Sequence, residues 1–182
     1  DLEEVVKEAR RLLDTVRKKL DESIKEAREL LREIEERFKK SADEVREELK
    51  RVEDELRRKR VPEEVERRLD ELRKRLEELT RRLKKELDDL KEELERRNER
   101  TKRELKRLID ELERRLRRVT RDKDDDVREL RKEVEDIIRR LDELVKKNTE
   151  DNRRVIKELR ELVEEHTRRV KKIIEDLERE VR

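Results

Sequence analysis

Core-type residues recur along the chain at intervals of eighteen positions. Three such series can be followed: Leu2, Leu20, Phe38 and Leu56; Leu76, Leu94, Leu112 and Leu130; and Thr101, Val119, Ile137, Val155 and Ile173. Eighteen residues correspond to five turns of an α-helix at about 3.6 residues per turn, whereas seven- and eleven-residue repeats make helices supercoil. The pattern therefore predicts long α-helices that are nearly straight.

Two interruptions divide this pattern into thirds. Pro62 is the only proline, and it suits the first turn of a helix but not a helix interior. The acidic run near residue 122 offers Asp122 or Asp124 as the cap of the next helix. At about 1.5 Å per residue, each third forms a helix about 90 Å long. The predicted helices span residues 2–60, 62–120 and 123–181.

Two further segments resemble helix starts but keep the helical phase. Residues 41–44 have the composition of a capping box, and residues 148–150 also look like a cap. The apolar stripe runs through both segments, so each is interpreted as helix interior. One stripe per helix, about 120° wide, suits three helices joined by short connections. The predicted fold is all-α: a single elongated, antiparallel up-down-up three-helix bundle over residues 1–182.

Polar residues that interrupt the stripes fall on two shared levels of this bundle. A buried hydroxyl or amide without a partner costs about 1–3 kcal/mol, so the members of each level are expected to bond to one another. Such layers penalise wrong registers, as a buried Asn does in coiled coils. The predicted first layer contains Ser23, Asn98, Thr101, Asn148 and Asn152, and the second contains Ser41, Thr80, His166 and Thr167.

His166 is the only histidine, and it lies within the stripe. A catalytic base needs a nucleophile or an oriented acid beside it, and zinc needs three or four ligands. The predicted neighbours of His166 are hydroxyls, so a hydrogen-bonded core histidine is expected. No catalytic, cofactor-binding or metal-binding residue is predicted, and the chain is not expected to be an enzyme.

The amino-acid composition excludes several classes of function. Charged residues make up 64% of the chain, yet 59 Lys and Arg nearly balance 57 Asp and Glu and leave a net charge of +2. Nucleic-acid binding needs clustered basic residues and is not expected. Because glycine and cysteine are both absent, phosphate-binding glycine loops and disulfides are excluded. No signal peptide or membrane segment is predicted, and the compartment stays unassigned. A monomer that needs no partner is expected, with a homo-oligomer as the alternative.

These features together resemble computationally designed, parametrically generated helical bundles of the untwisted three-helix type. The resemblance covers the whole chain, including its Leu/Ile/Val core and layered polar positions. It implies a hyperstable scaffold with no natural biochemical function. Three other classes stay open: a helix-exchange or switch protein that binds a partner helix, a natural coiled-coil-like rod, and an enzyme or metalloprotein. The handedness of the arrangement and the purpose of the bundle are also open.

Overall fold

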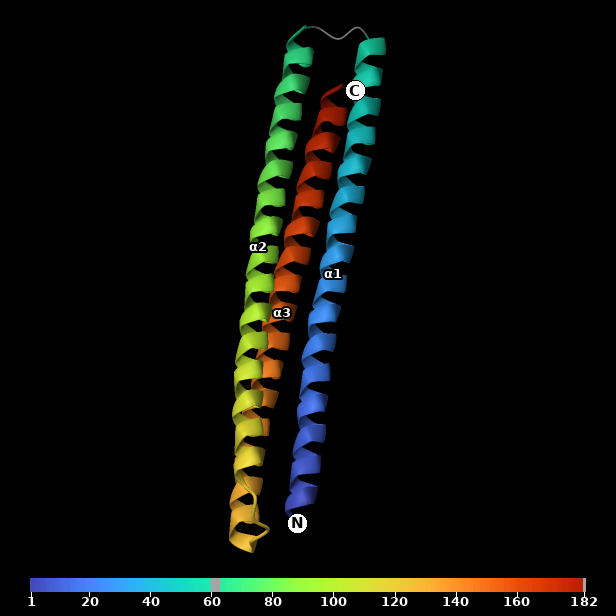
Figure 1. The fold of residues 1–182 in the computed structure, drawn as a ribbon. Coiled ribbons are helices and arrows are strands. Elements are labelled where there is room, and N and C mark those ends of the chain that lie inside the picture. The colour runs from blue at the N-terminus through green and yellow to red at the C-terminus, as the bar shows by residue number, and fades with distance from the viewer. Residues whose placement is uncertain (60–62, 182) are drawn as a thin grey trace. The chain divides into compact units, whose positions relative to one another are not determined.

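The protein folds into three long α-helices, which confirms the predicted all-α fold class. The computed structural model describes residues 1–59 and 63–181, with the backbone alone at residue 181. The helices are α1 (Leu2–Arg58), α2 (Glu63–Arg118) and α3 (Asp124–Val181), and no β-strand occurs in the described residues (Figure 1). Successive helices run in opposite directions. The expected role of Pro62 lies outside the described residues.

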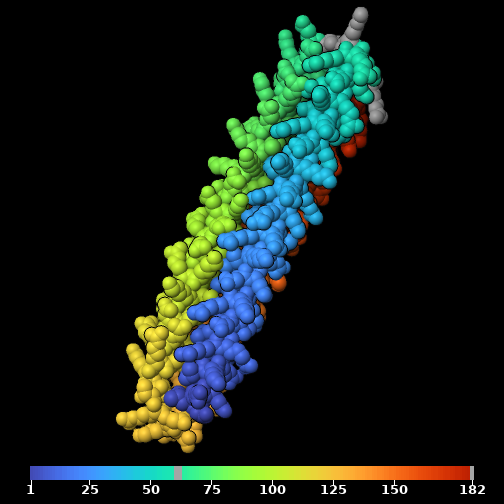
Figure 2. All heavy atoms as spheres, turned by 45° about the vertical axis from the view of Figure 1, so that its right-hand side comes forward, coloured from blue at the N-terminus to red at the C-terminus, as the bar shows by residue number. Residues whose placement is uncertain are grey.

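The charged residues at the helix ends interact favourably with the helix dipole. Acidic residues occupy the first turn of each helix, and Arg57 and Arg58 occupy the last turn of α1. The sequence predicts Asp122 or Asp124 as the cap of the third helix, but α3 begins at Asp124 itself and the carboxylate of Asp122 bonds to a different helix. The Oδ1 atom of Asp122 accepts a hydrogen bond from the backbone N–H of Leu2, at 3.2 Å, and so caps α1. Figure 2 shows the start of α1 beside the connection between α2 and α3.

Both segments that resembled caps are helix interior, as predicted. Helix α1 continues through residues 41–44, and α3 continues through residues 148–150. A capping side chain stabilises a helix start only where the backbone N–H groups lack partners. Inside a helix those groups are already bonded, so the local composition does not break the chain.

The chain divides into two compact units, and each helix contributes to both. Unit 1 comprises Asp1–Arg28 and Glu93–Arg154, and unit 2 comprises Glu29–Glu92 and Val155–Arg182. Each unit has an aliphatic core drawn from all three helices. The unit 1 core includes Ala9, Leu112 and Leu141, and the unit 2 core includes Val52, Leu76 and Ile174. Burying one large aliphatic side chain stabilises the fold by about 1.5–3 kcal/mol.

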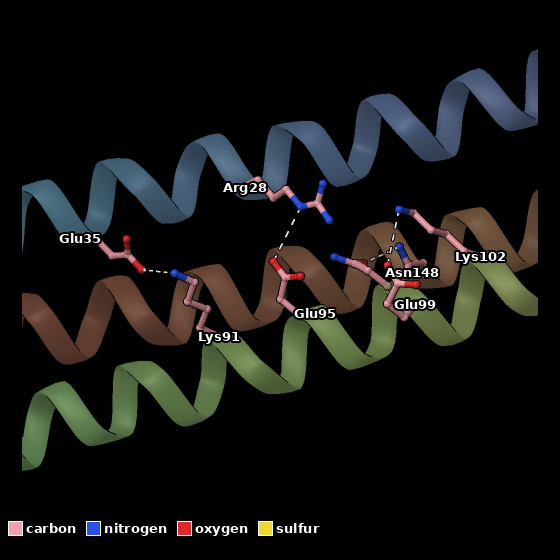
Figure 3. A network of polar contacts seen from close by, with 8 residues as sticks. Arg28, Glu35, Lys91, Glu95, Glu99, Lys102 and Asn148 are labelled. Atoms are coloured by element: carbon pink, nitrogen blue, oxygen red, sulfur yellow. Dashed lines mark hydrogen bonds and ion pairs between the residues drawn. The ribbon is translucent and has the colours of Figure 1, made fainter.

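Exposed ion pairs join helices at the surface of each unit. In unit 1, Arg28 of α1 lies 3.7 Å from Glu95 of α2 (Figure 3). In unit 2, Lys91 of α2 lies 3.2 Å from Glu35 of α1. All four side chains are more than 40% exposed, and an exposed pair contributes about 0–1 kcal/mol. The aliphatic cores therefore dominate the stability of both units.

Candidate functional site

A chain of hydrogen bonds crosses the core of unit 1 between α2 and α3. The Oγ1 atom of Thr101 donates to Oδ1 of Asn148 at 2.8 Å. The Nδ2 atom of Asn148 then donates to Oδ1 of Asn98 at 3.0 Å. All three side chains are at least 91% buried, so these bonds lie in a low-dielectric core. The structure thus brings together three of the five residues predicted for the first layer.

Ser23 bonds to a different partner from those predicted. Its Oγ lies 2.7 Å from Oγ1 of Thr149, a residue absent from the predicted layer. Because Thr149 donates its single hydroxyl proton to the carbonyl of Val145, at 2.9 Å, Ser23 must be the donor to Thr149. Thr149 has the helical phase of a candidate partner, although the repeat does not single it out. It follows Ser23 by 126 residues, which is seven repeats of eighteen.

Asn152 does not join the network, and the prediction that it does is wrong. Its side chain is 3% exposed, and both its Nδ2 and Oδ1 atoms lack a hydrogen-bond partner in the described residues. The pairing of Asn98 with Asn148 in antiparallel helices places position 152 level with Leu94. A leucine offers no polar atom, so a buried amide is left without a partner. Such a group costs about 1–3 kcal/mol for each unmet atom.

The second predicted layer, in unit 2, contains one interhelical hydrogen bond. The hydroxyl oxygens of Ser41 and Thr167 lie 3.0 Å apart. Thr167 donates its proton to the carbonyl of Val163, at 2.9 Å, so Ser41 is the donor in the pair. The same offset of 126 residues therefore joins α1 to α3 in each unit. The structure brings Ser41 and Thr167 together and leaves Thr80 out.

Thr80 bonds within its own helix rather than across the layer. Its hydroxyl donates to the carbonyl of Leu76, four residues earlier, at 2.9 Å. This back-bond is the usual local alternative for a threonine in a helix. Placing Thr80 in a network with Ser41 is therefore wrong: Thr80 has no hydrogen bond to another helix within the described residues, although its oxygen could still accept one.

His166 is half-buried and packs against an aromatic ring instead of a hydroxyl. Its ring centroid lies 6.0 Å from that of Phe38, with the planes tilted by 57°. No side-chain hydrogen bond of His166 occurs within the described part of the chain, so the predicted network at this residue is wrong. Burial lowers the pKa of His166 below its ordinary value, and the nearby cation Arg169 adds to this effect. The imidazole is therefore neutral at pH 7.

A cleft of about 380 Å³ opens beside His166 in unit 2. Its floor is aliphatic and includes Ala42, Val45 and Leu76, and we call it the His166 cleft. Ala42 stands eighteen residues after Ile24, which is 2% exposed and fills the equivalent helical position. An alanine leaves the volume of three carbon atoms empty at that position. The short side chain of Ala42 therefore contributes to the volume of the cleft.

No family model, curated protein or solved structure matches this chain. Within residues 1–59 and 63–181, no group of three or more His, Asp or Glu side chains is arranged to hold a metal ion. None of the described helices has a stretch long and apolar enough to span a membrane. The function is accordingly argued from the core polar residues and the His166 cleft.

Proposed function

We propose that the protein is a computationally designed structural scaffold with no catalytic role. Its function is to hold three helices in one register. The observation that supports this proposal best is the hydrogen-bond chain from Thr101 through Asn148 to Asn98. In this part of the core, aliphatic side chains alone would pack equally well in several alignments of the helices.

The register argument follows from the spacing of polar and apolar residues on α2. Moving α3 by one turn relative to α2 would place Asn148 between Leu94 and Asn98, or between Thr101 and Leu105, instead of between Asn98 and Thr101. The leucines would pack in either alignment, because Leu follows Leu at helical spacing along α2. The slip would leave at least one of these buried polar residues without its partner, at a cost of about 1–3 kcal/mol. The polar residues therefore select the observed alignment.

The test is to remove the network and measure the register directly. The variant N98L/T101V/N148L replaces every member of the chain with an apolar residue of similar shape. The protein has no cysteine, so K106C and K146C on the exposed faces of α2 and α3 accept spin labels selectively. Pulsed electron resonance then measures the distance between the labels. We expect one narrow distribution for the parent and a second population for the variant, displaced by about 5 Å along the helix axis.

The matched control is N152L, which changes a buried asparagine of the same helix but leaves the network whole. It should keep the single distance distribution of the parent. If the triple variant also keeps a single unchanged distance and the mass of one chain, the network does not select the register and the proposal fails.

A further inference from the structure

The His166 cleft contains aliphatic surface that the rest of the core buries. Between Ile34 and Val52, α1 has no fully buried side chain. Val45 and Leu49 occupy core positions of the repeat there, yet both are only partly buried and line the cleft. Removing aliphatic surface from water gains roughly 25 cal/mol per Å². An apolar group that filled the cleft would therefore bind favourably.

The size and polar groups of the cleft suit a small molecule. Its volume of about 380 Å³ falls within the roughly 300–1,000 Å³ that is typical of small-ligand sites. Thr80 uses its proton on Leu76, so its oxygen lines the cleft as an acceptor only. His166, neutral at pH 7, adds one N–H donor. A few directed polar groups among aliphatic side chains would orient a ligand.

The rim of the cleft is strongly cationic. Four cations and one carboxylate line it: Arg46, Arg73, Arg81, Lys84 and Glu77. Arg73 is already held by an ion pair with Glu53. The other three cations form no ion pair with any residue in the described ranges. Over the whole chain the charges nearly cancel, at 59 basic against 57 acidic residues, so this excess is local.

We propose that the His166 cleft binds a small amphiphilic monoanion, namely a molecule with an apolar ring body and one carboxylate. The body lies on Ala42, Val45 and Leu76. The carboxylate lies among Arg81, Lys84 and Arg46, where the unpaired cations attract it. The ligand thereby buries the aliphatic floor and compensates the charge of Arg46, Arg81 and Lys84, which form no ion pair with a residue in the described ranges.

The first experiment is a titration with naphthoate, compared with naphthamide of the same ring substitution. The two probes share size and ring, and differ in the charge of the head group. The chain has no tryptophan or tyrosine, so naphthalene fluorescence reports binding without background. We expect naphthoate to bind with a dissociation constant on the order of 0.1 mM, and naphthamide to bind about tenfold more weakly.

Two variants test the body and the head of the ligand separately. Ala42→Ile fills the floor and should weaken naphthoate binding at least about tenfold, while the midpoint of unfolding stays equal or rises. R81E/K84E reverses two rim charges and should weaken naphthoate binding about tenfold without affecting naphthamide. The matched control K74E/K85E makes the same change in net charge on exposed residues of α2 outside the cleft. It should leave the affinity for naphthoate nearly unchanged.

Several outcomes would overturn the proposal. One is the absence of saturable naphthoate binding below roughly 5 mM, an affinity weaker than a ligand of this size should reach in a fitted site. Equal affinity for naphthamide would remove the role of the charged rim. Undiminished binding by the Ala42→Ile variant, in a chain that still unfolds cooperatively, would place the bound probe somewhere other than the His166 cleft.

Discussion

Two asparagines one turn apart on α3 should respond in opposite ways to the same substitution. Asn148 and Asn152 are each 3% exposed, but only Asn148 has hydrogen-bond partners in the structure. Replacing either residue with leucine adds a similar apolar side chain to the core. The gain from apolar burial is therefore nearly the same in both variants. The difference between their free energies of unfolding then reports the hydrogen bonding of each amide.

The magnitudes follow from counting the polar atoms involved. N152L removes two buried atoms without partners, each costing about 1–3 kcal/mol, and should stabilise the fold by about 2 kcal/mol after allowance for the larger side chain. N148L strands the hydroxyl of Thr101 and the Oδ1 atom of Asn98 in the core. It should destabilise the fold by about 2 kcal/mol, because these losses exceed the gain from the leucine.

Guanidinium unfolding followed by circular dichroism measures both variants against the parent. For a slope of about 4 kcal/mol/M, each change should move the midpoint by roughly 0.5 M, upward for N152L and downward for N148L. A lower midpoint for N152L would mean that the amide of Asn152 has a partner in solution. Equal midpoints for the two variants would refute the argument that hydrogen bonding distinguishes the two positions.

Three further predictions concern single contacts. A double-mutant cycle of S23A and T149V should give a coupling of about 0.5–1.5 kcal/mol in chemical unfolding, and zero coupling would contradict the Ser23–Thr149 hydrogen bond. Because burial lowers the pKa of His166, the unfolded chain binds its proton first. The free energy of unfolding should therefore fall as the pH drops through about 6.5 towards the lower folded-state pKa, and the H166Q variant should lack this step. L94A, at a fully buried site, should cost about 2–5 kcal/mol in the same assay, and L49A, at the partly buried wall of the cleft, should cost less than half of that. Equal costs would contradict the difference in packing.

The hydrophobic period was sufficient to predict the fold, because long helices depend mainly on local spacing. It predicted three helices and the continuity of α1 and α3 through residues 41–44 and 148–150. The periodicity also implied that Asn98, Thr101 and Asn148 lie on one level. These predictions need only the angular phase of each residue and the reversal of direction at each connection.

The partners of individual polar side chains depended on the tertiary structure. The position of Ser23 around its helix lets it face several hydroxyls and amides. Only the packed helices show that Thr149 is within hydrogen-bonding distance. Asp122 looked like a cap for its own helix, but its carboxylate bonds the first N–H of α1. Hydrogen bonds require distances near 3 Å, which is far finer than the helical level that a sequence period defines.

The sequence by itself therefore determined the helices, their lengths and the level of each core residue, since these follow from the repeat and the chain direction. Only the tertiary structure decided that Asn152 lacks a partner and that Thr80 bonds its own helix. It alone showed a cleft beside His166 that Ala42 lines. The physical reason is that hydrogen bonding and cavity volume depend on contacts between residues distant in sequence, whereas helix formation and amphipathicity depend on neighbours along the chain.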